Sequence, residues 1–69
     1  MIRVIVKCRN RHRELVIFKK KISIREMLRE LGLDYDQVLV IVNGSLATPD
    51  EVVYGDSKVE ILVVYGCEM

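Results

Sequence analysis

The fold of this chain depends most on one stretch near its end, Lys58-Val59-Glu60-Ile61-Leu62-Val63-Val64-Tyr65. Every second residue from Val59 to Tyr65 is apolar, and the residues between them change from charged to apolar along the stretch. This alternation predicts a β-strand, and apolar residues on both faces are typical of a central strand. Gly66 interrupts the pattern. We therefore predict a central strand that leaves the domain into a short tail.

Length and composition limit the function classes. With 69 residues, 51% of them hydrophobic, the chain has the size of one small domain with one thin core. No apolar run approaches the roughly 20 residues that a membrane-spanning helix needs, and charges at Arg3 and Lys7 argue against a signal peptide. No metal-ligand spacing or nucleophile–base set is visible. We expect a cytoplasmic protein that is not an enzyme and holds no permanent metal or cofactor.

The net charge of +1 conceals an uneven distribution. Residues 1–30 contain ten basic and three acidic residues, a net charge of +7, whereas residues 31–69 contain one basic and seven acidic residues, a net charge of −6. Two solvated faces without a partner would explain this pattern, and so would a dipolar module steered toward charged protein partners. Nucleic-acid binding is disfavoured, since it calls for a basic stripe with exposed aromatics and the chain has only Phe18 and three tyrosines.

Two strands and a helix are predicted in the first half of the chain. The first strand covers residues 2–8, a turn at residues 10–12 places the single histidine in solvent, and a second strand covers residues 14–19. The side chains predicted to be buried from the first strand are Ile2, Val4, Val6 and Cys8. A capping box at Ser23 and a terminating Gly32 bound the helix. Its apolar stripe consists of Ile24, Met27, Leu28 and Leu31.

The second half of the chain predicts a hairpin, a turn and the last strand. Residues 38–42 form an apolar strand, followed by the hairpin signal Asn43-Gly44 and a short return arm. A brief helical turn is expected around residues 52–53. This order predicts an α+β fold, a β-grasp roll in which one helix packs across a mixed sheet of four to five strands. The first and last strands are then parallel neighbours in its centre. Residues 1–65 form a single domain and residues 66–69 a flexible tail.

The chain resembles the ThiS/MoaD family of sulfur carriers, which are small ubiquitin-like β-grasp proteins. The resemblance is carried by Val40-Ile41-Val42-Asn43-Gly44, Thr48-Pro49-Asp50, Gly55-Asp56, Val59-Glu60-Ile61 and Gly66. In that family a partner enzyme of the ubiquitin-activating type uses ATP to adenylate the carboxylate of a Gly-Gly tail. Sulfur then replaces the adenylate, and the thiocarboxylate supplies a sulfur-accepting synthase in thiamine or molybdopterin biosynthesis, or a tRNA base. The resemblance implies the same role here.

The tail departs from the family pattern. Gly66 matches the penultimate glycine, Cys67 replaces the last one, and Glu68 and Met69 extend the chain further. The tail is either trimmed to Gly66 or Cys67 before activation, or carries sulfur as a Cys67 persulfide, or has lost its activity; an inert exposed thiol is the simplest role for Cys67. The resemblance assigns sulfur carriage to Gly66 and Cys67, and contact with the partner to Tyr65 and Gly66.

Three expectations remain open at this point. Parallel first and last strands would bring Cys8 and Cys67 to the same end of the sheet, where a disulfide needs Cα atoms within about 7 Å. The exposed sheet face leading to the tail is the expected docking surface, although the sequence leaves open which side chains face outward. The alternative function is a non-catalytic interaction module resembling the TGS domain, with an inactive tail. The end of the chain directly after the last strand favours the carrier.

Overall fold

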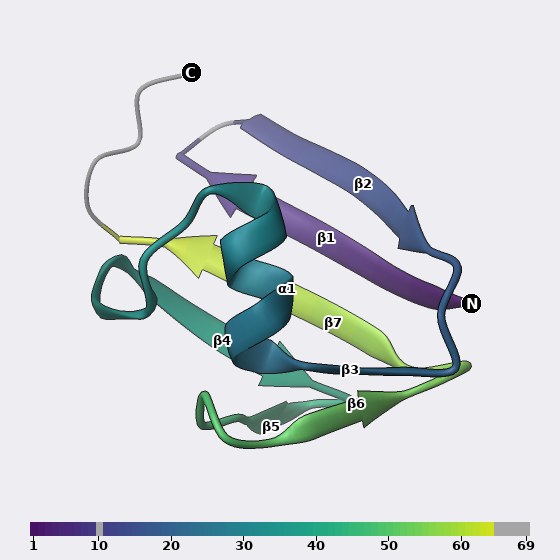
Figure 1. Ribbon diagram of the computed structural model, residues 1–69. Coiled ribbons are helices and arrows are strands. Elements are labelled where there is room, and N and C mark those ends of the chain that lie inside the picture. The colour runs from purple at the N-terminus through teal and green to yellow at the C-terminus, as the bar shows by residue number, and fades with distance from the viewer. Residues whose placement is uncertain (10, 65–69) are drawn as a thin grey trace.

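The structure is a computed structural model that describes residues 1–9 and 11–64 (Figure 1). The elements are β1 (Ile2–Cys8), β2 (Arg11–Ile17), β3 (Lys21–Ser23), α1 (Ile24–Leu31), the 3-10 helix η1 (Tyr35–Gln37), β4 (Val38–Val42), β5 (Ser45–Leu46), β6 (Val52–Tyr54) and β7 (Lys58–Val63). One sheet has the strand order β2-β1-β7-β4-β5, and β3 pairs with β6 in a second, two-stranded sheet.

The five-stranded sheet is mixed and carries α1 across one face (Figure 1). The first and last strands, β1 and β7, are parallel neighbours in register from Arg3↔Lys58 to Lys7↔Leu62, whereas β1–β2, β7–β4 and β4–β5 are antiparallel. The predicted β-grasp fold is therefore confirmed. We call the sheet face under the helix the inner face and the opposite one the outer face.

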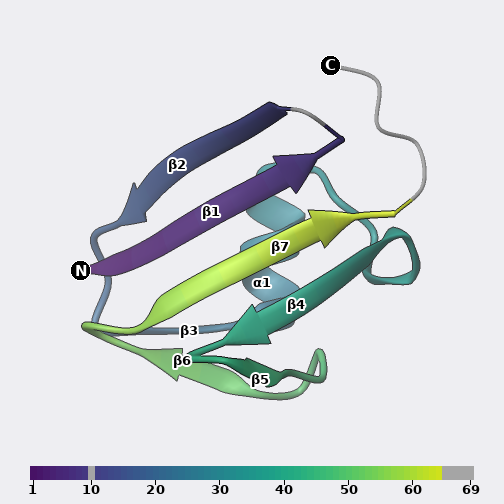
Figure 2. The same cartoon turned by 180° about the vertical axis from the view of Figure 1, so that it is seen from behind.

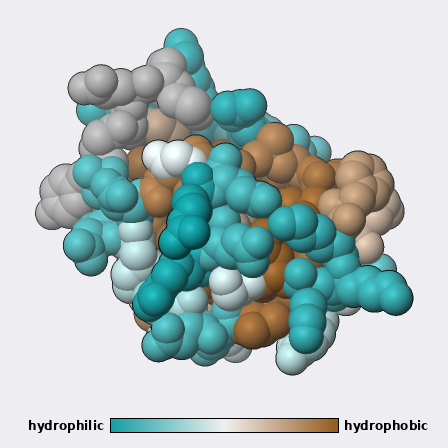
Figure 3. All heavy atoms as spheres, in the orientation of Figure 1, coloured by the Kyte–Doolittle hydropathy of each residue, from teal (hydrophilic) through white to brown (hydrophobic). Residues whose placement is uncertain are grey.

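The core lies between α1 and the inner face. Every second residue of each central strand faces it, because alternate side chains of a strand point to opposite faces, and Val42 and Val63 are only partly buried. The buried core residues are Ile2, Val4, Val6, Cys8, Ile22, Ile24, Met27, Leu28, Val38, Val40, Ala47, Val53, Val59 and Ile61. Cys8 and the other predicted residues of β1 are among them. Seen from the helix side, hydrophilic atoms run along α1 and hydrophobic atoms show beside it, toward β1 and β2 (Figure 3).

The helix begins and ends at the predicted residues. Ser23 Oγ accepts a hydrogen bond from the Glu26 backbone N–H at 3.1 Å, which satisfies one free donor of the first turn. At the other end, Gly32 adopts a left-handed conformation with φ 72°, and the Leu33 N–H donates to the Leu28 carbonyl at 2.9 Å. The predicted apolar stripe faces the core, with Leu31 packed at its margin.

Three sequence predictions were wrong in detail. The second strand covers Arg11–Ile17 instead of residues 14–19, because Arg9 turns the chain with a left-handed φ of 58° and pairing resumes at Cys8↔Arg11. His12 consequently lies in β2, although it is exposed as expected. The helical turn expected around residues 52–53 is strand β6, whose pairing with β3 buries Ile22 and Val53.

The hairpin predicted at Asn43-Gly44 is confirmed. Both residues have positive φ, 50° and 88°, as the tight turn between β4 and β5 requires. Asn43 also ties this turn to the start of β7, since its side-chain Oδ1 accepts from the Lys58 N–H at 3.0 Å and its own N–H donates to the Lys58 carbonyl at 2.9 Å. The turn therefore fixes β4 against β7, the strand that leads to the tail.

Candidate functional site

The base of the tail lies between two neighbouring strands. Central strand β7 runs out of the sheet between the end of β1 and the start of β4 (Figure 1, Figure 2). Val63 pairs with Val38, and the Val64 N–H donates a 2.7 Å hydrogen bond to the Gln37 carbonyl of η1. These contacts fix the direction in which the chain leaves the domain. The predicted tail residues Tyr65, Gly66 and Cys67 lie outside the described residues, and their roles stay predictions.

The outer face of the sheet carries an apolar cluster, which we call the outer patch. Figure 2 shows this face with α1 behind the sheet. The outer patch consists of Leu39, Ile41, Leu46 and Leu62. Leu39 pairs with Leu62 across β4 and β7, and Ile41 pairs with Leu46 across β4 and β5. Leu39 is 47% exposed and Leu46 67%, so much of the apolar surface of this cluster contacts water.

Ion pairs border the outer patch. Glu60 lies beside Ile41 on the outer face, 3.7 Å from the amino groups of both Lys7 and Lys58. Exposed pairs of this kind contribute little to stability, typically below about 1 kcal/mol each. They separate the outer patch from Ile5 and Val16, which also face outward. The outer face thus has an apolar half on β7, β4 and β5 and a more charged half on β1 and β2.

The outer patch reaches the base of the tail. Leu39 and Leu62 form the cross-strand pair next to Val38 and Val63, and the adjoining Val64 is 54% exposed. The register settles the facing that the sequence left open, because it places Val16, Leu39 and Ile41 on the outer face. Phe18 lies beyond β2 and is 80% exposed. The expected exposed face leading to the tail is therefore apolar where it meets the tail.

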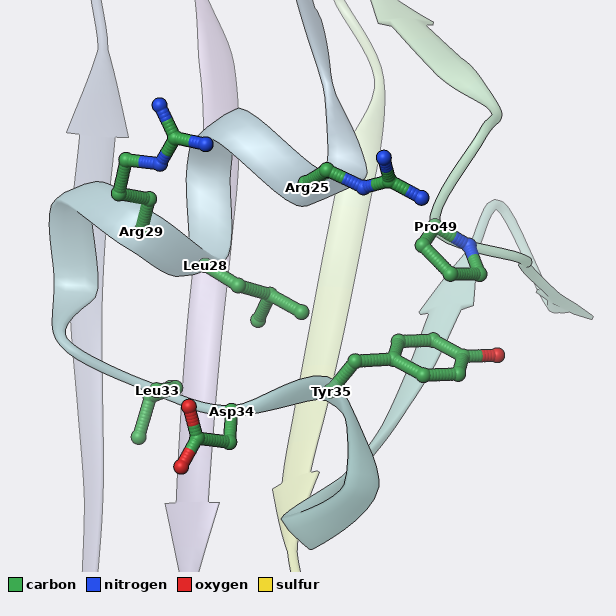
Figure 4. Close-up of a pocket in the computed structure, with 7 residues that line it drawn as sticks. All are labelled: Arg25, Leu28, Arg29, Leu33, Asp34, Tyr35 and Pro49. Atoms are coloured by element: carbon green, nitrogen blue, oxygen red, sulfur yellow. The ribbon is translucent and has the colours of Figure 1, made fainter.

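A shallow groove of about 330 Å³ lies on the other side of the molecule, beside the helix (Figure 4). Its lining residues are Arg25, Leu28, Arg29, Leu33, Asp34, Tyr35 and Pro49. Arg25 pairs with Asp50 at 3.1 Å, and the Tyr35 hydroxyl donates to the Ala47 carbonyl at 3.4 Å. The lining contains no histidine, cysteine or serine to serve as nucleophile or base. The groove offers contacts for a ligand but no set of reacting groups.

One titratable group is shifted by a described contact. A 3.1 Å hydrogen bond from Lys19 Nζ to Glu30 Oε1 raises the pKa of the Lys19 amino group above its usual value, and the Glu26 carboxylate at 3.7 Å acts in the same direction. This amino group joins the connection before β3 to the helix. Lys19 therefore supports the fold and lies apart from the outer patch.

The metal and cysteine expectations have different outcomes. Residues 1–9 and 11–64 contain no cluster of three or more metal-ligating side chains. Cys8 is buried at 3% exposure as predicted, but it is not a free thiol. The predicted pairing partner, Cys67, lies outside the described residues, so that pairing stays a prediction. No helix in the described part of the chain is long and apolar enough to cross a membrane.

Comparison with known proteins agrees with the fold. The model of the ThiS family matches residues 2–66, nearly the whole chain and the predicted Gly66 with it. Comparison with individually curated proteins gives no match. Proteins of the matched family are small sulfur carriers that interact with the enzymes of sulfur transfer, and they are carriers rather than catalysts. The extent of the match and the β-grasp fold show that this chain belongs to the ThiS family.

Proposed function

We propose that this protein carries sulfur in the cytoplasm as a thiocarboxylate at the end of its tail, after a ubiquitin-activating-type partner enzyme has adenylated the tail with ATP. Family membership supports the carrier role. The observation that carries the rest of the proposal is the position of the outer patch, an exposed apolar surface that continues to the base of the tail. A partner that covers the outer patch also receives the tail.

The outer patch has the properties of a docking surface. Leu39 and Leu46 contribute little to the core, since they remain 47% and 67% exposed. Apolar groups gain free energy when a partner removes them from water, at about 25 cal/mol per Å² of apolar area. A contiguous apolar patch with a polar rim is typical of a protein interface. The ion pairs of Glu60 supply part of that rim.

The chemistry takes place on the tail. A carboxylate oxygen attacks the α-phosphorus of ATP and pyrophosphate leaves, which gives an acyl adenylate. A sulfide donor then attacks the acyl carbon and AMP leaves, which gives the thiocarboxylate. The carrier contributes no base and no metal to either step. We propose Gly66 or Cys67 as the reactive end after trimming, and contacts of Tyr65 and Gly66 with the enzyme.

The thiocarboxylate then passes its sulfur to an acceptor. From the family resemblance we propose that the second partner is a sulfur-accepting synthase of thiamine or molybdopterin biosynthesis, or a tRNA-thiolating enzyme. The same tail, which follows β7 in the sequence, serves both partners in turn. The domain stays constant while the tail alone changes chemically.

Intact mass spectrometry tests the proposal directly. The protein is isolated from its native cells and incubated with ATP, a sulfur donor and cell extract, with a variant ending at Tyr65 as the control. We expect a chain that ends at Gly66 or Cys67 and gains the mass difference between sulfur and oxygen; the control gains nothing. A sulfur adduct on Cys67 of the full chain identifies a persulfide carrier instead. If only the unmodified chain appears, the carrier proposal fails and the TGS-like interaction module takes its place.

A further inference from the structure

The turn between β1 and β2 carries an unusual concentration of positive charge. We call Arg9, Arg11 and Arg13 the arginine hairpin; all three side chains are exposed. The first acidic residue of the chain is Glu14, so nothing before it offsets these charges. Arg11 and Arg13 are two positions apart in β2 and share one side of the strand, about 7 Å from each other along it. Three like charges therefore lie close together.

These guanidinium groups differ from other cations of the molecule. Within residues 1–9 and 11–64 they make no ion pair and no hydrogen bond. The basic residues that have carboxylate partners are Lys7, Lys19, Arg25 and Lys58. An unpaired guanidinium offers several donors in a fork that fits a carboxylate or a phosphate. The arginine hairpin is therefore open to a bound anion.

The arginine hairpin lies at the tail end of the sheet. Because β1 and β7 run parallel side by side, the turn that follows β1 is at the same end as the last residue of β7, as both views show (Figure 1, Figure 2). Arg11 and Arg13 are opposite Cys8 and Val6, so they lie on the inner-face side of β2, whereas the outer patch lies on the outer face of β7, β4 and β5. The tail end of the sheet thus has a charged surface on the inner-face side of β2 and an apolar surface on the outer face.

The nature of the surface indicates its ligand. Residues 1–17 contain no phenylalanine, tyrosine or tryptophan on which a nucleic-acid base could stack, and His12 carries their only aromatic ring. The position beside the tail points to the protein that receives the tail. We propose that the arginine hairpin docks on a carboxylate-rich surface of the adenylating partner, next to the channel that takes the tail. This inference rests on the proposed function. It adds that the partner surface beside the tail channel is negatively charged.

Association kinetics test the inference. Charges that flank a docking site speed association by factors of about 10 to 1,000, and salt weakens the effect. We compare R11Q/R13Q with the matched control K20Q/K21Q, which removes two exposed lysines without described ion pairs. Arg9 is left unchanged, because its left-handed backbone is sensitive to substitution. Stopped-flow rates are measured with the adenylating enzyme of the same organism at several salt concentrations, after circular dichroism has shown that both variants fold.

We expect R11Q/R13Q to lower the association rate constant on the order of tenfold at low salt and to flatten its salt dependence. The control should stay within about twofold of the unmodified protein. Equal losses in both variants would mean that only net charge matters and would overturn the inference, as would no loss in either. Tighter binding of a 12-nucleotide polyuridine probe than of the enzyme, abolished in R11Q/R13Q, would overturn it in favour of a phosphate ligand. If the unmodified protein does not bind the enzyme, the proposed function fails together with the inference.

Discussion

The two faces of the five-stranded sheet are built from the same strands but have different tasks. In β4, Val40 on the inner face is 1% exposed, whereas its neighbour Leu39 on the outer face is 47% exposed. Both residues are strongly apolar, so hydrophobicity alone does not decide which one is buried. The helix covers one face and leaves the other to solvent. Inner residues therefore hold the fold together, and outer residues remain available to a partner.

Shortening one side chain on each face to alanine should separate these two tasks most strongly. Ile61→Ala in the centre of β7 removes a side chain with 0% exposure, and we expect it to lower the free energy of unfolding by about 2–5 kcal/mol. That loss is most of the stability of a domain this small. Leu39→Ala should cost about 1 kcal/mol or less, because its side chain is half exposed. Urea denaturation measures both. Equal losses would contradict the division of the two faces.

Charge on the outer patch should disrupt binding and leave the fold intact. Leu39→Asp is compared with Val52→Asp, because Val52 has a similar exposure of 43% but lies in β6, outside the outer patch. We expect Leu39→Asp to weaken binding to the adenylating enzyme about tenfold or more, since an interface core excludes unpaired charge. Val52→Asp should bind normally. Isothermal titration calorimetry measures both affinities. An equal loss of affinity in the two variants would show that the outer patch is not the docking surface.

Weakening the helix should affect the inner face alone. Ser23→Ala removes the cap that accepts from the Glu26 N–H, and we expect a loss of about 1 kcal/mol of stability. Ser45→Ala, in exposed strand β5, serves as the control and should change little. Thermal denaturation measures the loss, and binding of the folded Ser23→Ala protein should be unchanged. Weaker binding by the folded variant would show that the helix side also contacts the partner.

We expect the smallest effect on stability from the ion pairs of Lys19. They join the connection between β2 and β3 to the helix that covers the inner face. The Lys19 pKa is raised in the folded protein above its ordinary 10.5. Its stabilisation is therefore complete below pH 10.5 and disappears as the pH rises through the higher folded value. Lys19→Met should lower the urea midpoint slightly at pH 7. In strong alkali the variant and the unmodified protein should have the same midpoint. Lys20→Met is the control, and an equal shift in it at pH 7 would exclude a specific role for Lys19.

Local signals in the sequence determined several elements of this protein. Alternation in residues 2–8 predicted β1 to the residue, and Ser23 and Gly32 marked the ends of α1. Asn43-Gly44 predicted the hairpin, because few residues other than glycine and asparagine adopt positive φ at low energetic cost. The motifs around these turns also led to the family. Each of these features depends on interactions between residues that are close in the chain, so the sequence suffices to predict it.

Only the tertiary structure decided the pairings between distant segments. Strands β3 and β6 have three residues each, too few for a periodic pattern, and form because Ile22 meets Val53 over the core. In β4 both faces are apolar, so periodicity alone does not distinguish Leu39 from Val40. Pairing with β7 and the position of α1 set that facing, and with it the outer patch. The arginine hairpin likewise reaches the base of the tail only because β1 and β7 are parallel neighbours.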